Sequence, residues 1–439
     1  MDRIRKFLDY SAFGSVLILP IFLTHFRGVA EGLIDLIAIL FLLRSTIDST
    51  WDWVRQFWFM VVLLWWGWIV VCTIPFGPLH FGGSDSLLQA LAVIRFPIFV
   101  AALQYWVLRN TLRRRWLIYV IIGCVAYIIL QMLCQVIVGV NFFGQPRYMD
   151  GTLTGPYDHP RAAAPLSRLL IPISLVGCNY FVNYYKGIRG NLGALLVLIS
   201  ASAILILAGQ RMPLMLFLMG IILSLIWLKA LRPLALIMAC LIPAMTAATA
   251  FISPQSFNHL VIYFIKQMSH FSSSPYGLIY IRAIVMALAN PIAGLGYDAF
   301  RNSCGDPTYF HGWPPWDATS GNGGGAVICL PHPHNHYLEA LINGGIPGLI
   351  FFSLMIFVWL KELSIGLNFE AKALNDRIRK SWRVGLFAAI FVHEWPFASS
   401  SDFVNMPLGG WFFLLLGIGL AYTWSYKTKI LGQRINDVG

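Results

Sequence analysis

Long apolar stretches separated by short polar ones recur along the whole chain. Each stretch is close to the ~20 residues that an α-helix needs to cross a bilayer. The pattern predicts an all-α, polytopic integral membrane protein with about twelve transmembrane helices. We place these helices at roughly 11–27, 28–44, 56–75, 87–108, 116–139, 164–185, 192–209, 212–229, 233–252, 336–360, 382–398 and 407–425. The second segment has a weaker pattern, because it carries Glu31 and Asp35.

Two polar stretches are longer than the others, at 141–163 and 253–335. They divide the chain into residues 1–252, with nine helices and the short loop 141–163, a large loop 253–335, and residues 336–439 with three helices and a tail. Within the large loop we expect helices near 256–270 and 275–290, apolar enough to lie on the membrane surface, and then an irregular region. Loops of this length in a compact protein are usually functional or disordered.

Composition and charge agree with a membrane location. The chain is 58% hydrophobic and only 11% charged, whereas soluble domains carry about 25% charged residues. The net charge of +12 would suggest nucleic acid in a soluble protein, but the basic residues mostly lie in short loops between apolar stretches. That bias predicts that both termini face the cytoplasm and that the two long loops face the other side. We expect no nucleic-acid partner and no cleavable signal peptide.

Candidate chemistry is concentrated at the boundary between the large loop and the tenth predicted helix. Three imidazoles, His332, His334 and His336, lie there within five residues. A histidine at a membrane–water boundary can take or give a proton near neutral pH, so one of them is a candidate general base. Zinc sites on helices need ligands at i and i+4 of one helix; His332, four positions before His336, lies in the loop ahead of Pro333, and the sequence has no HExxH motif. A purely structural histidine at the interface is the alternative.

Basic residues outside the cytoplasmic segments oppose the usual charge bias, so each calls for a reason. Arginine binds phosphate oxygens bidentately and keeps its proton, so several arginines converging from different loops would hold a diphosphate. Arg211 stands in a tight turn before Pro213, where the start of the next helix would offer free backbone donors to the same anion. The nine residues of this group are Arg27, Arg95, Arg147, Arg161, Arg168, Arg211, Lys266, Arg282 and Arg301.

The alternative for these arginines is a structural role, by snorkelling or by pairing with acids such as Asp158, Asp298 and Asp306. For Arg95, which lies within a predicted helix, we expect an ion pair with Asp35 or Glu31. Cysteines offer one further prediction. Cys304 and Cys329 lie in the large loop and can form a disulfide if that loop faces an oxidising compartment, with two free thiols as the alternative.

Four sequence blocks resemble the bacterial O-antigen ligases, a family that includes the O-antigen polymerases and the protein O-oligosaccharyltransferases. His332-Pro333-His334-Asn335 with Tyr337-Leu338, and then Gly345-Ile346-Pro347-Gly348, resembles the signature HN-x-[YF]-L-x-x-L…G-[IV]-x-G. The stretch from Asn290-Pro291 through Gly294 and Gly296 to Phe300-Arg301 resembles the NP-[LI]-x-G-x-G-x-x-x-F block. Gly209-Gln210-Arg211 resembles the G-[ED]-R turn, and Thr154-Gly155-Pro156-Tyr157-Asp158-His159-Pro160 resembles the TG-x-[YF]-x-x-P loop. The resemblance covers about residues 145–350.

The resemblance implies a GT-C-like glycosyltransferase of the Gram-negative inner membrane with a periplasmic active site. Such enzymes transfer a glycan from undecaprenyl diphosphate to a hydroxyl of lipid A–core, with inversion and without metal or other cofactor. His334 would be the general base, and Asn335 would orient it or open the helix, while Arg211, Arg282, Arg161, Arg147 and Arg301 would hold the diphosphate. Gln210 departs from the family's frequent Glu, and His336 is additional to the motif, so His332 and His336 are possible accessory groups.

Two alternatives stay open at this stage. The polymerase and the protein O-oligosaccharyltransferase use the same chemistry, with a second lipid-linked glycan or a pilin Ser or Thr as acceptor. A lipid or solute transporter would instead place ionisable residues near mid-membrane, and the candidates do not converge in an obvious repeat. We favour the ligase, because the long histidine-bearing loop with its two cysteines most resembles that branch. The sequence does not define the oligomeric state, and a monomer is one option.

Overall fold

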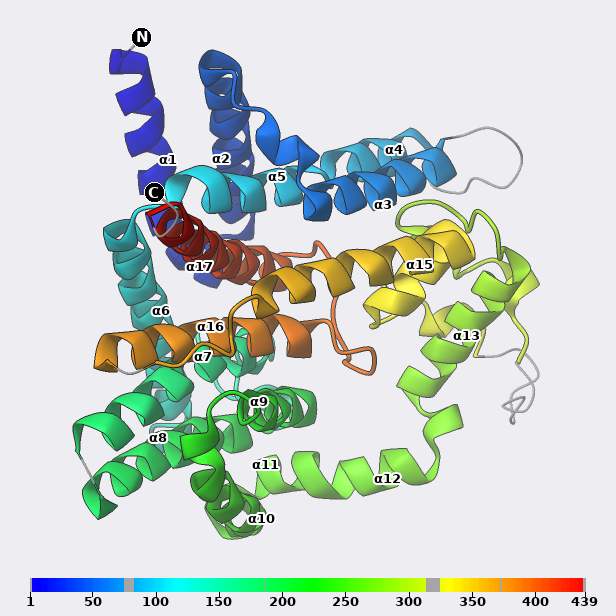
Figure 1. Cartoon of the computed structure of the whole chain (residues 1–439). Coiled ribbons are helices and arrows are strands. Elements are labelled where there is room, and N and C mark those ends of the chain that lie inside the picture. The colour runs from blue at the N-terminus through cyan, green and yellow to red at the C-terminus, as the bar shows by residue number, and fades with distance from the viewer. Residues whose placement is uncertain (1, 75–82, 186, 313–323, 372, 437–439) are drawn as a thin grey trace.

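The computed structural model describes residues 2–74, 83–185, 187–312, 324–371 and 373–436. Over this part the protein is built from helices, and the only β-pairing is an isolated bridge between Val140 and Pro146. Residues 313–323 of the predicted large loop and the last residues of the predicted tail lie outside the described ranges. Figure 1 shows the helices as a bundle, with α11 to α13 extending along one end of it.

Each of the twelve predicted segments lies on a helix. In chain order these are α1 (Asp2–His25), α2 (Arg27–Asp48), α3 (Phe57–Thr73), α4 (Gly83–Ala92) continuing into α5 (Arg95–Ala102), α6 (Thr111–Ile137), α7 (Ala163–Tyr184), α8 (Ile188–Leu207), α9 (Arg211–Ser224), α10 (Arg232–Ile252), α15 (His336–Ser364), α16 (Leu374–His393) and α17 (Leu408–Asn436). Eight of the described helical segments are long and apolar enough to cross a membrane. The described chain is therefore all-helical with several candidate membrane spans.

The other four segments differ for identifiable reasons. Helices α3 and α9 are apolar but shorter, with 17 and 14 residues. Helices α2 and α16 carry more charged residues, which for α16 cluster in its first half. The prediction for residues 382–398 was wrong at its end, because α16 stops at His393 and the chain then forms a loop as far as α17.

The predicted large loop contains the two helices that its apolar pattern indicated. The first is made of α11 (Pro254–Phe257), a π-helical stretch (Asn258–Ile262) and α12 (Tyr263–Ser269). The second is α13 (Pro275–Ala289), whose N-cap Ser274 accepts a hydrogen bond from Gly277 N. Helix α13 packs against α15, and the short α14 (Ala299–Ser303) follows it (Figure 1). The loop is thus docked on α15, the helix that begins at His336.

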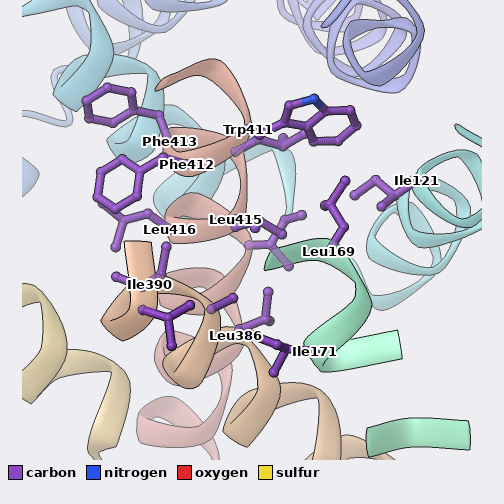
Figure 2. Close-up of a cluster of buried hydrophobic side chains, with 14 of the residues drawn as sticks. Ile121, Leu169, Ile171, Leu386, Ile390, Trp411, Phe412, Phe413, Leu415 and Leu416 are labelled. Carbon is purple, nitrogen blue, oxygen red and sulfur yellow. The ribbon is translucent and has the colours of Figure 1, made fainter. Parts of the chain in front are cut away.

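Close helix packing builds the core. Figure 2 shows Trp411, Phe412 and Phe413 of α17 beside side chains of α6, α7 and α16. Between membrane helices the gain comes from van der Waals contact rather than from water exclusion, so small residues that allow close approach are valuable. Gly385 of α16 is such a residue, because an added Cβ would lie 2.4 Å from Pro172 Cα of α7.

A break in α15 joins the large loop to the bundle. Gly345 has φ +64, inside a helix that otherwise runs from His336 to Ser364. At this break the carbonyls of Ile342 and Asn343 accept hydrogen bonds from Leu295 N and Gly296 N, at 2.8 and 3.0 Å. Ile346 N in turn donates to Pro291 O at 2.8 Å. The Asn290–Arg301 block therefore docks by its backbone into the interrupted helix.

The predicted ion pair of Arg95 is also present. Its guanidinium contacts Glu31 and lies 3.2 Å from Asp35 Oδ1, so one cation of α5 faces two acids of α2. The ion pairs offset the free-energy cost of placing these charged side chains between apolar helices.

Candidate functional site

The loop between α16 and α17 encloses the start of α15. Asn335 caps α15, because its Oδ1 accepts from Tyr337 N and Leu338 N, both at 3.0 Å. Its Nδ2 donates to Pro396 O at 2.6 Å, so the same side chain also fixes the loop. Tyr337 adds a hydrogen bond from its hydroxyl to Glu394 O at 2.8 Å. Asn335 thus opens the helix, one of the two roles expected for it.

His334 is held by one residue of that loop at two points. Ser400 N donates to His334 O at 3.0 Å, and His334 Nδ1 lies 3.1 Å from Ser400 O. A carbonyl only accepts, so Nδ1 carries the proton and Nε2 keeps its lone pair. His334 also has φ +55, a conformation that costs a non-glycine residue about 1–3 kcal/mol and that is often found at functional sites.

The surroundings of His334 favour its neutral form. Burial lowers the pKa of the His334 imidazole below its ordinary 6.5, against the opposing effect of the hydrogen bond to Ser400. Beside it, burial and the neighbouring His334 lower the pKa of His332 to about 4. The two rings contact edge to face, with centroids 4.5 Å apart. Both groups are therefore neutral at pH 7, the state that a base requires.

Side chains of α12 and α13 connect Arg211 to the region of His334. The ring of Tyr276, in α13, lies 5.4 Å from the ring of His334, and Tyr276 is also an electrostatic neighbour of Arg211. The Arg211 guanidinium lies 5.5 Å from the centre of the Phe264 ring of α12. Among the described residues it has no hydrogen bond and no ion pair. Arg211 is thus a partly exposed cation without a carboxylate partner, near the candidate base.

The turn that carries Arg211 is fixed by both long loops. Gly209 has φ +76, a conformation that suits glycine in a tight turn. Its carbonyl lies 2.7 Å from His259 Nδ1 of the large loop, and Gln210 Nε2 donates to Pro160 O of the 141–163 loop at 2.6 Å. Gln210 therefore acts here through its amide donor, which a carboxylate would lack.

Arg282 lies elsewhere, in the packed interior of the large loop. Only 1% of the residue is exposed. Its guanidinium donates to Cys304 O at 2.5 Å and to Gly325 O at 3.1 Å, and it lies over the Phe310 ring. It also contacts the disulfide between Cys304 and Cys329, which the structure contains as the sequence predicted. The structure does not expose Arg282 to a substrate, in contrast to its expected place in a diphosphate clamp, because loop carbonyls already take its donors.

The remaining arginines are spread over three places. Arg301 is half exposed and lies 3.2 Å from Asp298 Oδ2, the kind of acid partner that the alternative interpretation named. It is also an electrostatic neighbour of His332. Arg147 donates to Ser253 Oγ at 2.9 Å and lines a cavity beside α11, while Arg161 lines a different cavity beside the end of α1. The predicted arginines therefore do not form one cluster.

His336 is engaged at both ring nitrogens. Its Nε2 lies 3.0 Å from Ser401 O, so this nitrogen carries a proton, and its Nδ1 lies 3.1 Å from Glu394 Oε2. The residue is only 5% exposed. These contacts make His336 a link between α15 and the end of α16, rather than a second open base.

Of the residues that the structure describes, one group is close enough to hold a metal ion. His336, His393 and Glu394 offer ligand atoms within 4.8 Å of one another. However, both nitrogens of His336 already have partners, and the buried Arg168 is an electrostatic neighbour of Glu394. A second positive charge in this buried place would be unfavourable, so we describe the group as an ion-pair cluster.

The loop residues that contact Asn335, His334 and His336 were missed by the sequence reasoning. They are Pro396, Ser400 and Ser401, all of which act through backbone carbonyls or amides. Any residue type can supply such groups, so the only available signal was the short polar run Ser399–Asp402 after an apolar stretch.

Comparison with known proteins bears on three of the four sequence blocks. No curated protein matches the chain. A family model does match, over a region that includes the Gly209-Gln210-Arg211 turn, the Asn290–Arg301 block and the histidine motif but not the loop at 154–160. Enzymes of that family are glycosyltransferase-like. Residues 195–353 match the family Wzy_C, described as O-Antigen ligase, and this confirms the resemblance to the O-antigen ligase family.

Proposed function

We propose that this protein is an O-antigen ligase, which transfers a glycan from undecaprenyl diphosphate to a hydroxyl of lipid A–core at the periplasmic face of the inner membrane. One observation carries the proposal. The matched region contains both Arg211 and His334; the ring of Tyr276 contacts that of His334, and Tyr276 also interacts electrostatically with Arg211. A base and an unpartnered cation at one place are what transfer from a diphosphate to a hydroxyl requires.

The proposed reaction uses these groups in a single displacement. The acceptor hydroxyl gives its proton to Nε2 of His334, and its oxygen attacks the anomeric carbon on the face opposite the diphosphate, which inverts that carbon. The bond between this carbon and the diphosphate oxygen breaks, and Arg211 stabilises the charge left on the diphosphate. Deprotonation by a positioned base contributes about 10²–10⁴-fold.

Three further residues have narrower roles in this proposal. Asn335 positions His334 by capping α15 and by holding Pro396. His332 packs its neutral ring against that of His334, and Arg301 contributes positive charge in the neighbourhood of His332. We leave Arg282 out of the substrate contacts because it is buried against loop carbonyls, and we leave His336 out of the proton transfer because both its nitrogens are engaged.

The test uses membranes with the wild-type protein or the variants His334→Ala and His311→Ala. Each sample receives a glycan on undecaprenyl diphosphate, lipid A–core and EDTA, and the gel mobility of lipid A–core is the readout. We expect a shift with wild type and with His311→Ala, an exposed histidine of the same loop, and none with His334→Ala. Lengthening of the lipid-linked glycan alone would instead identify a polymerase, and no transfer at all would contradict the proposed activity.

A further inference from the structure

A second basic site lies on the other flank of the loop that holds His334. A cavity of about 250 Å³ is lined by residues of α1, the start of α2, the 141–163 loop and Pro407. Arg27 and Arg161 both line it, from segments far apart in the chain. Arg27 reaches Asn405 Oδ1 at 3.4 Å, while Ser400 of the same loop binds His334. The cavity and the candidate base therefore share one supporting loop.

The charges in this cavity favour an anion. Among the described residues the Arg161 side chain has no hydrogen bond or ion pair, and the only contact of this kind for Arg27 is the one to a neutral amide. Asp158 is the single carboxylate among the described residues of the lining; it lies 3.3 Å from His159 Nδ1, outside the lining, and also interacts electrostatically with Arg161. Two guanidinium groups facing one cavity with one acid leave an excess positive charge. Paired guanidinium groups suit the oxygens of a phosphate group.

Exposed aromatic side chains contact His25 of the cavity lining or adjoin such a residue in the chain. Phe26 and Phe143 are each 61% exposed, and Phe142 is 56% exposed. The ring of Phe143 lies edge-on to His25, a residue of the cavity lining, at 6.0 Å. Exposed aromatic side chains around a charged cavity, at the end of a candidate membrane helix, suit a ligand with a charged head and apolar chains.

We propose that the cavity between Arg27 and Arg161 binds the phosphate headgroup of an amphiphile held in the membrane, as a site separate from Arg211. The phosphate oxygens lie against the two guanidinium groups, and the apolar chains lie along Phe26, Phe142 and Phe143. The occupant is defined by its chemistry, a phosphate monoester or diester on lipid chains. The proposal does not depend on the glycosyl-transfer activity, since binding alone defines it.

The experiment measures binding of a fluorescent phosphatidic acid to the full chain in a nonionic detergent. Phosphatidylcholine with the same chains and inorganic phosphate as a competitor are the comparison ligands. We expect phosphatidic acid to bind more tightly than phosphatidylcholine, and Arg27→Gln or Arg161→Gln to weaken its binding about tenfold, the scale of one charge-assisted hydrogen bond. Lys266→Gln removes an exposed cation of α12, outside the cavity, and should leave binding unchanged.

Asp158→Asn separates the proposal from a folding defect. This substitution removes the single carboxylate of the cavity, so we expect tighter binding of phosphatidic acid, which a damaged fold would not produce. Equal affinity for phosphatidylcholine, or an equal loss with Lys266→Gln, would overturn the proposal in favour of nonspecific lipid or charge effects. If inorganic phosphate displaced the fluorescent phosphatidic acid with an affinity equal to that of phosphatidic acid itself, the site would bind free phosphate, and the proposal of an amphiphile would be overturned. His334→Ala should still bind, so this test stands apart from that of the proposed function.

Discussion

At the scale of single residues, the protonation of His334 decides when the site can work. Only the neutral imidazole accepts a proton, and burial lowers the pKa of His334 below its ordinary 6.5. The neutral form therefore predominates at pH 7 and is lost as the pH falls through the lowered pKa. We expect kcat/KM, measured between roughly pH 5 and 8, to be flat at the upper end and to fall at a midpoint below 6.5. A midpoint above that value would contradict the assignment, and His311→Gln should leave the profile unchanged.

Arg211 and Arg282, both expected from the sequence to hold the diphosphate, should respond differently to substitution. Arg211→Gln removes a cation that has no hydrogen bond or ion pair among the described residues, so folding should be retained while kcat falls about 10²–10³-fold, as for other groups that stabilise transition-state charge. Arg282→Gln leaves the buried carbonyls of Cys304 and Gly325 without their donor, which costs about 1–3 kcal/mol per group. Thermal unfolding and limited proteolysis of the large loop distinguish the two. If Arg282→Gln kept a stable loop but lost glycan transfer, Arg282 would contact the substrate after all, and the structural role assigned here would be wrong.

These two arginines also show where residue-level prediction ends. The sequence places both arginines outside the cytoplasmic segments, and the guanidinium group of either one is able to bind phosphate oxygens. Which one is exposed depends on the docking of α13 against α15 and on the Cys304–Cys329 loop, contacts between segments far apart in the chain. The sequence identified the residue type and the loop, while tertiary packing decided the role.

At the scale of elements, the break in α15 sets the position of the large loop. An alanine at residue 345 would have to adopt φ +64, and its Cβ would lie 2.4 Å from Ile292 O. A backbone with φ 64 and ψ −162 is essentially restricted to glycine, and it costs a residue with a Cβ roughly 1–3 kcal/mol. We expect Gly345→Ala to lower the thermal stability and to separate the Asn290–Arg301 block from α15, seen as faster proteolysis there. Gly305→Ala is the control, because an added Cβ meets nothing within 4 Å at that site; equal behaviour of the two variants would contradict this account.

The helices were predictable because apolar length is a local property of the sequence. All twelve predicted segments lie on helices, and the two helices of the large loop were placed close to α11–α12 and α13. The loop between α16 and α17 was not predictable in the same way. Its contacts with His334 and His336 use the backbone of Ser400 and Ser401, which no residue pattern marks.

At the scale of the whole molecule, basic residues divide unequally between the two ends of the bundle. Arg113 and Arg114 at the start of α6 and the basic first half of α16 lie at one end, and Arg211, Tyr276 and His334 lie at the other. Cytoplasmic loops of membrane proteins carry an excess of Lys and Arg. The first end should therefore face the cytoplasm, and the proposed site should face the periplasm, where lipid-linked glycans and lipid A–core are both present in the proposed reaction.

Reporter fusions test this orientation directly. Alkaline phosphatase is active only after export, so a fusion after Gly144 or Gly305, in the two long loops, should be active. A green fluorescent protein fused after Gly187 or Gly366, in the turns between α7 and α8 and between α15 and α16, should fluoresce, because it folds in the cytoplasm. The positive charge of cytoplasmic loops is the physical reason for this orientation. Replacing Arg113, Arg114 and Arg115 by Gln should therefore reduce the difference in reporter activity between fusions on either side of α6. An active phosphatase after Gly187 would place His334 in the cytoplasm, away from any periplasmic acceptor.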